Sequence, residues 1–283
     1  MDEQQLPEGA PPLPADLALR AIQRELRTQV VGHTMLRYER VGSTNDLAKE
    51  RAQAGHDEGL VILAEEQRAG RGRMGRAWVS PAGTSLLLSV LLRPSWLSPG
   101  DVFAITMVAG VALCEAVEQV AQLRAALKWP NDLLLPAGAP SALHKAAGIL
   151  CDVRLEGERL AWVVVGIGLN VNWTPAGTVD GRDLAASATS VAAAVGGPVD
   201  RGALLRALLR RLDARYLALR GGGRDELFAA WRGRLATIGQ QVAVRLPGGE
   251  LHGLAEDVEP SGALRVRDAH GTLHLVTAGD VNF

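Results

Sequence analysis

Two short apolar runs enclose a segment rich in glycine and arginine. Residues 60–64 (LVILA) and 85–92 (SLLLSVLL) are apolar almost throughout, which is typical of strands buried in a sheet. Between them, residues 70–80 (GRGRMGRAWVS) place three glycines and three arginines in the first seven positions. Glycine lets backbone N–H groups approach a ligand closely, and arginine offers a charged fork that matches carboxylate and phosphate oxygens. The pattern therefore predicts an ordered anion-binding loop that joins two buried strands.

Other classes of glycine-rich segment fit this motif less well. A nucleic-acid tether of the RGG type is repetitive, whereas this motif occurs once, lies between apolar strands and ends in Trp78. A Walker loop would continue with Gly-Lys-Ser or Gly-Lys-Thr, and a dinucleotide fingerprint would open a helix. The net charge of −1 gives no global attraction to nucleic acid, so the basic site is a local one.

The sequence around this loop predicts an α/β fold. Ser43 or Thr44 is expected to cap a helix, and residues 136–141 and 172–183 are expected to be loops. Apolar periodicity predicts helices at 16–28, 44–54, 103–120, 188–195, 201–220 and 225–235, and further strands at 36–41, 125–129, 147–155 and 160–167. These elements indicate a mixed β-sheet flanked by helices, which we expect to span residues 16–237.

The two ends of the chain differ from the central region in composition and hydrophobic pattern. Residues 1–15 are rich in proline and acidic side chains, which is typical of a disordered tail. From residue 238 onward, short alternating runs (QVAVRL, LRVRD, LHLV) are separated by turn signals. We therefore expect a small C-terminal β-barrel, SH3-like in size, over residues 238–283.

Cysteine usage and hydropathy narrow the class of protein further. Cys114 and Cys151, the two cysteines, lie in apolar stretches without metal-ligand spacing and are expected in the core. The sequence contains neither an apolar run of about 18 residues nor a signal-peptide pattern. We therefore expect a cytoplasmic protein that does not associate with a membrane.

Three further short motifs that contain polar residues follow the arginine-rich loop. They are residues 128–132 (KWPND), 144–150 (HKAAGIL) and 166–172 (GIGLNVN). Each has an ordinary structural explanation by itself: a Pro-Asn-Asp turn, a lysine at a solvated strand end, and a strand that needs close backbone packing. In this order, and preceded by residues 42–45 (GSTN) and 65–67 (EEQ), the set resembles the biotin protein ligases from about residue 36 to the C-terminus.

The resemblance implies a two-step reaction. Members of this family join biotin to ATP, forming biotinyl-5′-adenylate and pyrophosphate, and then pass biotin to one lysine of a carboxyl carrier domain. The first step brings a carboxylate and a triphosphate together, so like charges must be neutralised. Two unit charges 4 Å apart interact by roughly 4 kcal/mol at an effective dielectric of about 20, which explains a need for several arginines and Mg²⁺.

The resemblance also assigns roles to residues of this sequence. The residues matched to the biotin site are Ser43, Thr44, Asn45, Gln67, Gly70, Arg71, Gly72, Trp78, Lys145 and Gly148. Those matched to the ATP site are Arg71, Arg73, Arg76, Trp78, Lys128, Asn131 and Asn170. Arg73, Lys145 and Asp132 are the expected catalytic residues, with Asp132 also the expected Mg²⁺ ligand. Met74 stands where many relatives carry a basic or polar residue, and no anion-binding role is expected for it.

Three alternatives remain open at this stage. Some relatives are also repressors, but their winged helix-turn-helix needs on the order of 60 residues, and only 42 precede Ser43, so DNA binding is not expected. Lipoate ligases and octanoyltransferases share the fold, although we expect them to lack the GRGRxGRxW pattern. A protein that only sequesters biotin is the third. The sequence does not fix the oligomeric state, and a monomer or weak homodimer is expected.

Overall fold

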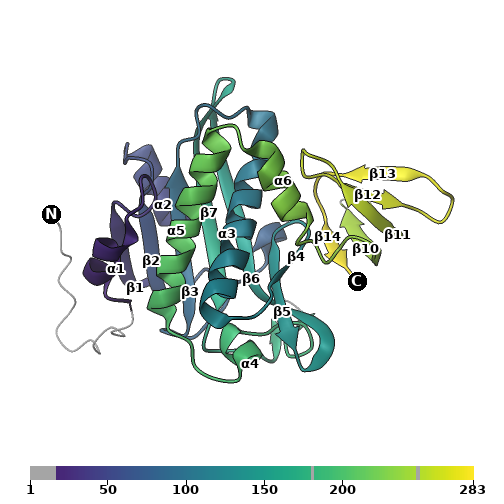
Figure 1. Ribbon diagram of the computed structural model, residues 1–283, viewed down its shortest axis with the longest axis horizontal. Coiled ribbons are helices and arrows are strands. Elements are labelled where there is room, and N and C mark those ends of the chain that lie inside the picture. Colours follow the sequence, from purple (N-terminus) through teal and green to yellow (C-terminus); the bar gives the residue numbers. More distant parts are fainter. Residues whose placement is uncertain (1–16, 180–181, 247–248) are drawn as a thin grey trace.

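The computed structural model describes residues 17–179, 182–246 and 249–283 (Figure 1). The tail predicted to be disordered at residues 1–15 lies outside these residues. The strands of the large sheet are β1 (Met35–Val41), β2 (Val61–Gln67), β3 (Ser85–Leu92), β4 (Ala126–Lys128), β5 (Asp132–Ala137), β6 (Ala139–Glu156) and β7 (Arg159–Asn170).

The large sheet is mixed, as the sequence predicted. Its strand order is β1-β2-β3-β7-β6-β5-β4, with β1 and β2 parallel and every other neighbouring pair antiparallel. The central strand β7 lies between β3 and β6, so residues 166–170 of the motif 166–172 run through the middle of the sheet. Strands β8 (Thr178–Val179) and β9 (Arg182–Asp183) form a separate small ladder.

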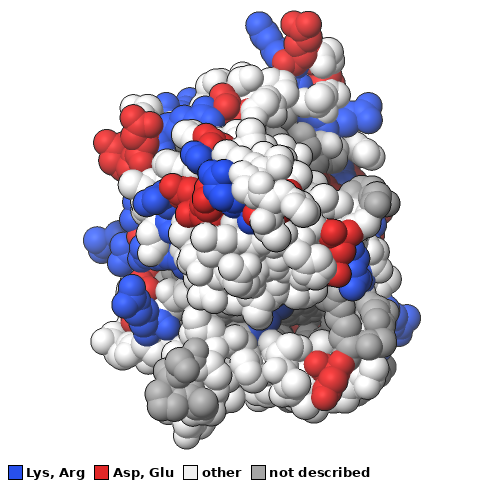
Figure 2. Space-filling view, turned by 90° about the vertical axis from the view of Figure 1, so that its right-hand side faces the viewer, with Lys and Arg blue, Asp and Glu red and all other residues white. Residues whose placement is uncertain are grey.

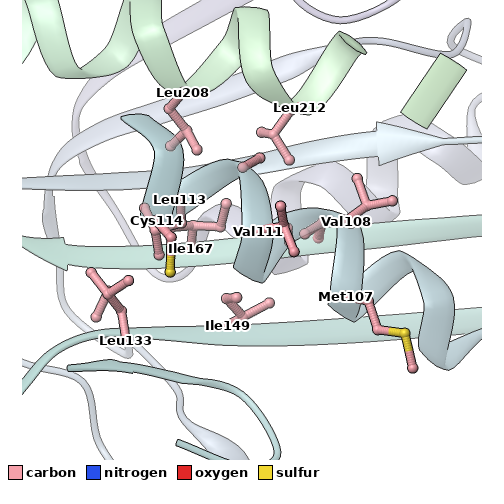
Figure 3. Packing of buried hydrophobic residues seen from close by; sticks show 14 of the residues in the cluster. Met107, Val108, Val111, Leu113, Cys114, Leu133, Ile149, Ile167, Leu208 and Leu212 are labelled. Carbon is pink, nitrogen blue, oxygen red and sulfur yellow. The ribbon is translucent and has the colours of Figure 1, made fainter. Parts of the chain in front are cut away.

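Two long helices cover one face of this sheet (Figure 1). Helix α3 (Phe103–Ala121) is packed between the sheet and α5 (Arg201–Arg220), and Figure 3 shows its side chains meeting those of both layers. A helix enclosed in this way is expected to be apolar over most of its surface, and the charged residues of α3, Glu115 and Glu118, lie toward its C-terminal end. Cys114 of α3 is fully buried, and burial raises the pKa of its thiol to about 12, which confirms that it is a core residue.

A smaller helix covers the opposite face. Helix α2 (Thr44–Gln53) buries Ala48 and Ala52 against Leu60, Ile62 and further apolar residues of β2, β3 and β7. The remaining helices are α1 (Leu19–Leu26), α4 (Val191–Val195) and α6 (Arg224–Arg232), with short 3₁₀ turns η2 (Arg73–Gly75) and η3 (Pro99–Asp101).

The C-terminal residues form a second sheet beside the end of β4 (Figure 1). Its strands, in the order β13-β12-β11-β10-β14, are β10 (Gln241–Leu246), β11 (Gly249–Val258), β12 (Leu264–Arg267), β13 (Leu273–Val276) and β14 (Asp280–Asn282), with antiparallel pairing throughout. This small antiparallel unit confirms the predicted fold class. The boundary expected at residue 237 stays a prediction.

Trp129 anchors the C-terminal sheet to the larger one. Its indole N–H donates a 2.8 Å hydrogen bond to the carbonyl of Gly262, and its backbone N–H donates to the Thr237 hydroxyl at 2.9 Å. Gly262 has a φ of +90°, and a Cβ built on it would lie 2.0 Å from the Phe103 ring of α3. The position therefore needs glycine both for its backbone conformation and for its close packing.

Three of the predicted elements were wrong at least in part. Residues 172–183, predicted as a loop, contain β8 and β9, which pair with each other. Residues 136–141, predicted as a loop, contribute instead to β5 and β6, which turn at Gly138 with a φ of +68°. Helix α4 begins only at Val191 because residues 187–189 pair with Lys145 of β6: Lys145 N–H donates to Ser187, and Thr189 N–H donates to Lys145.

Among the residues that the structure describes, one helical segment has the length and composition of a membrane span. It is the segment Pro99–Ala121, and 67% of its most apolar 18-residue window is buried inside the protein. It is therefore the core helix of the fold.

Figure 2 shows the face formed by the right-hand side of Figure 1, where basic and acidic side chains are interspersed around uncharged surface.

Candidate active site

A cavity of about 690 Å³ lies where the large sheet, the arginine-rich loop and the C-terminal sheet meet. Its walls include the start of α2, the end of β2, the loop, the β4–β5 turn, strands β6 and β7, the segment 183–188, and β14. Of the residues predicted for the site, the cavity is lined by Ser43, Thr44, Asn45, Gln67, Arg71, Gly72, Arg73, Arg76, Trp78, Lys128, Asn131, Asp132, Lys145, Gly148 and Asn170.

Gly70 is the one predicted site residue outside this lining. Its carbonyl accepts a 2.9 Å hydrogen bond from Trp78 N–H, and a Cβ built on it would lie 2.4 Å from the Trp78 carbonyl oxygen. Gly70 therefore shapes the base of the loop, where a side chain would not fit.

One end of the cavity is uncharged and polar. Ser43, Thr44 and Asn45 are all buried at the start of α2. The Thr44 backbone N–H donates a 2.8 Å hydrogen bond to Gln67 Oε1, and the Thr44 hydroxyl lies 3.1 Å from the same atom. Ser43 occupies the N-cap position, but its side chain makes no capping hydrogen bond, so the predicted side-chain cap is wrong.

Two glycines of β7 make room for this lining. A Cβ on Gly166 would lie 2.1 Å from Asn45 Oδ1, and a Cβ on Gly168 would lie 2.5 Å from the Trp78 ring. Alternate residues of a strand face the same side, so Gly166 and Gly168 form one flat strip beneath these two side chains. The GIG sequence of residues 166–168 is thus explained by close packing.

The arginine-rich loop folds as a small hairpin. Gly72 N–H donates a 2.7 Å hydrogen bond to the Arg76 carbonyl, and Met74 at the tip has a φ of +57°. Met74 is 58% exposed, so it contributes no anion-binding group and little buried surface. Arg71 forms an ion pair with Asp46 of α2.

The other two loop arginines reach toward the C-terminal sheet. Arg73 Nη1 donates to Asn131 Oδ1 at 3.2 Å and to the Gly279 carbonyl at 3.4 Å. Arg76 forms an ion pair with Asp280. Burial lowers the pKa of the Arg73 guanidinium, which Asp132 and Asp280 partly oppose, yet arginine remains charged near neutral pH. The loop thus brings fixed positive charge to the cavity.

Lys145 and Asp132 face each other across the pairing of β5 and β6. Lys145 Nζ lies 2.7 Å from Asp132 Oδ1, as an ion pair without the alignment of a hydrogen bond. The same ammonium lies 5.8 Å from the centre of the Trp78 ring. A Cβ on Gly148 would lie 3.4 Å from Lys145 Nζ, so glycine at 148 leaves the lysine room.

Three polar atoms of the cavity residues are buried without a hydrogen-bond partner in the part of the chain that the structure describes. Two of them, the indole N–H of Trp78 and Oδ1 of Asn170, have no ion-pair partner either; the third is Oδ1 of Asp132, which has the ion pair with Lys145. Asn170 Nδ2 donates instead to the Thr189 carbonyl at 3.0 Å. Buried polar atoms are rarely left unpaired, so the Trp78 donor and the Asn170 acceptor indicate places where a ligand completes the site.

Several residues of the site were not predicted from the sequence. Ser89 contacts Thr44 and Asn45 from the middle of β3, and a serine within the apolar run 85–92 was the only signal for it. Asp280, Asn282 and Phe283 line the cavity from the C-terminal end, where sequence spacing gave no signal because they reach it through tertiary contacts.

The chain matches two families of known domains. Residues 38–170 match the Biotin/lipoate A/B protein ligase family, and residues 237–283 match the biotin protein ligase C-terminal domain. Both matches include cavity residues described above.

Similar whole proteins include two biotin–[acetyl-CoA-carboxylase] ligases. That of Mycobacterium tuberculosis is 35% identical over 277 residues, which cover 92% of this chain and 94% of the relative. That of Paracoccus denitrificans is 37% identical, covering 78% and 89% of the two chains. The bifunctional ligase/repressor BirA of Bacillus subtilis is 30% identical, covering 94% and 79%.

Solved structures agree with these matches. A biotin protein ligase from Aquifex aeolicus in complex with biotin and ATP has the same fold, with a TM-score of 0.72, 24% identity, and coverage of 88% of this chain and 98% of that one. The biotin protein ligase from Leishmania major in complex with biotin has a TM-score of 0.59 and 27% identity, covering 87% and 99%. The curated ligases resemble this chain in sequence over most of its length, and the solved ligases have the same fold. The chain therefore belongs to the biotin protein ligase family.

Proposed function

We propose that this chain is an ATP-dependent biotin protein ligase. It activates biotin as biotinyl-5′-AMP and transfers it to a lysine of the biotin carboxyl carrier domain of an acyl-CoA carboxylase. The observation that carries the proposal is the cavity itself: an uncharged polar end at Thr44 and Gln67, and a cationic end at Arg73 and Lys145. Biotin has the same two ends, a cyclic urea and a carboxylate.

The polar end of the cavity fits the urea. A urea needs both donors and acceptors in an otherwise apolar pocket, and hydroxyl and carboxamide groups supply both. Trp78, on the flat strip of Gly168, covers the apolar middle of the ligand. The carboxylate then lies toward Lys145.

The first chemical step joins biotin to the α-phosphorus of ATP. A carboxylate oxygen attacks the phosphorus, a P–O bond forms, and the bond to pyrophosphate breaks. Lys145 and Arg73 stabilise the negative charge that builds on the phosphoryl oxygens, and removing one such group costs on the order of 10²–10³ in rate in other enzymes. Arg71, Arg76 and Lys128 hold the rest of the triphosphate.

The second step passes biotin to the carrier. The lysine amine attacks the acyl carbon of the adenylate, an amide bond forms, and AMP leaves with the C–O electron pair. The amine must lose a proton in this step. We assign its acceptance to Asp132, whose carboxylate lies in the cavity 2.7 Å from Lys145 Nζ.

Exchange of Asp132 for asparagine tests this assignment. Asp132→Asn is expected to slow biotin transfer from preformed biotinyl-5′-AMP to a carrier domain by about 10²-fold or more. The transfer rate is measured in single turnover, without ATP. Transfer at the wild-type rate would show that the carboxylate does not accept the proton.

Magnesium fits the donor set of the cavity. Mg²⁺ binds proteins through one or two carboxylates and takes its other ligands from phosphate and water. Asp132 and the unpaired Asn170 Oδ1 are oxygen donors of this kind, and the described residues contain no group of three or more His, Cys, Asp or Glu that could hold a metal by themselves. When bound, Mg²⁺ would neutralise part of the triphosphate charge.

ATP–pyrophosphate exchange tests the proposed function. Exchange is measured with biotin, lipoate and octanoate, on the wild type, on Arg73→Ala, and on the control Arg206→Ala, whose arginine pairs with Glu25 away from the cavity. We expect exchange with biotin alone, lost in Arg73→Ala and retained in the control. Exchange with lipoate or octanoate instead of biotin would indicate a ligase for another acid. No exchange with any of the three acids would indicate a binding protein without ligase activity.

We also propose that the protein acts in the cytoplasm as a monomer or weak homodimer and does not bind DNA. Helix α3 is mostly buried inside the protein, which argues against its spanning a membrane. Basic and acidic side chains are interspersed on the face in Figure 2, which argues against nucleic-acid binding at that face. Gel-shift assays test DNA binding and sedimentation tests the oligomeric state, each with biotin and ATP present.

A further inference from the structure

Four large apolar side chains are exposed at the opening of the cavity. They are Met74, Val79, Leu143 and Phe283. All four also line the cavity, so they lie where the cavity meets the surface, and we call them the apolar rim. Exposed apolar side chains that gather at one place are typical of a surface that a protein partner covers.

Met74 is the member of the rim that the fold explains least. Its φ of +57° lies in the left-handed region, where glycine and asparagine are favoured and a side chain such as methionine is uncommon. The side chain is 58% exposed, so little buried surface offsets this backbone conformation. Since neither the backbone nor the packing of the loop requires methionine, a contact with a partner gives this side chain a role.

The four residues come from separate parts of the fold. Met74 lies at the tip of the arginine-rich loop, Val79 follows the loop, and Leu143 belongs to β6 of the large sheet. Phe283 follows β14 of the C-terminal sheet, and its ring centre lies 5.3 Å from Lys128 Nζ. A partner that covers the rim therefore contacts the loop and both sheets at once.

The second chemical step determines which partner fits this place. The amine of the acceptor lysine must enter the cavity to reach the acyl carbon and Asp132. A lysine carries its amine on a four-carbon stem, so the backbone of the carrier domain must come to the opening of the cavity. A second copy of this chain seated on the rim would keep the carrier out.

We propose that the apolar rim is the docking surface for the carrier domain, and that Met74 is a specificity-determining contact on this surface. The inference rests on the proposed function, in which the biotin acceptor is a lysine of that domain. It implies an apolar patch beside the acceptor lysine, because apolar side chains gain free energy by leaving water together. The rim takes no part in the adenylation of biotin.

The test measures the KM for a biotin carboxyl carrier domain, with biotin and ATP saturating. Met74→Asn removes the apolar side chain and suits the left-handed backbone, so the loop keeps its conformation. This variant is expected to raise the carrier KM about tenfold with little change in kcat, as for the lost burial of one apolar side chain. Met74→Leu keeps the apolar surface, and its carrier KM is expected to lie within about twofold of the wild type.

Val79→Thr and Leu143→Thr extend the test to the rest of the rim. Each is expected to raise the carrier KM several-fold. Leu275→Thr is the matched control, because Leu275 of β13 is 60% exposed, about as much as Met74, and lies outside the cavity lining. The control is expected to keep the wild-type KM.

Two further readouts separate docking from chemistry. ATP–pyrophosphate exchange with biotin is expected to be unchanged in all of these variants. Transfer from preformed biotinyl-5′-AMP to n-butylamine, which has no docking surface, is also expected to be unchanged.

The outcomes distinguish this inference from the proposed function. A carrier KM that Met74→Asn leaves unchanged, or that Leu275→Thr raises equally, would overturn the inference while leaving the proposed function intact. Loss of exchange in Met74→Asn would place this residue in the adenylation step and would also overturn the inference. A wild type that shows no exchange with biotin would overturn the proposed function itself.

Discussion

Single glycines decide how closely the cavity side chains approach the sheet. Gly168 is a clear case, because the Trp78 indole occupies the space that a Cβ at this position would need. The indole in turn lies beside the Lys145 ammonium. A residue without functional groups thus sets the position of two residues that have them.

Gly168→Ala is expected to displace Trp78 and weaken biotin binding. The added Cβ would lie 2.5 Å from the ring, and overpacking of this kind costs about 1–3 kcal/mol. The control is Gly197→Ala, where a Cβ has no neighbour within 4 Å. Titration of Trp fluorescence with biotin checks the prediction, and equal affinity in the two variants would contradict it.

At the scale of elements, a buried ion-pair cluster fixes α5 to the sheet. Arg201, at the start of α5, is 1% exposed and lies 2.8 Å from Glu65 of β2, which also accepts a 2.8 Å hydrogen bond from Arg37 of β1. Arg201 also donates to the Ser85 carbonyl of β3 at 3.2 Å. One side chain therefore connects a helix to two strands next to the cavity.

Loss of Arg201 is expected to destabilise the whole fold. Arg201→Met leaves Glu65 buried with less positive charge around it, and removing one partner of a buried ion pair costs about 3–5 kcal/mol. Arg232→Ala breaks an exposed pair with Asp257 and is expected to cost less than about 1 kcal/mol. Urea unfolding of both variants gives the comparison. Similar losses in both would contradict a special role for the buried cluster.

The elements themselves were predictable where local pattern decides them. The predicted helix 201–220 coincides with α5, and the fold class followed from strand and helix periodicity. The strands at residues 136–141 were not predictable in this way. Their proline and glycine content is typical of a loop, whereas pairing between β5 and β6 makes most of these residues strand. Ser89 and Asp280 reached the site through long-range contacts, which a linear pattern does not contain. The roles of the site residues stay predictions.

At the scale of the whole molecule, two sheets share one cavity. The C-terminal sheet is fixed through Gly262 and Trp129, and its last strand places Asp280 against Arg76. The position of the loop arginines therefore depends on how the second sheet is seated.

Gly262→Ala is expected to raise the KM for ATP several-fold with little change in biotin affinity. The new Cβ would clash with Phe103 and displace β14 from Arg76, whereas the uncharged polar end at Thr44 and Gln67 is built by α2 and the large sheet. Gly271→Ala is the control, because its φ of +82° imposes the same backbone strain with no neighbour within 4 Å. Equal effects of the two variants on ATP would trace the change to backbone strain.

The residues that line the cavity are synthesised over a long interval of translation. Its lining begins at Ser43 and ends at Phe283, so the site has no complete form until β14 pairs with β10. At synthesis rates of about 5–20 residues per second, the ribosome needs roughly 12–48 s to pass from the first of these residues to the last. During that interval the arginine-rich loop exists without the carboxylate of Asp280. A nascent chain thus carries its arginine-rich loop well before the cavity that the loop lines is complete.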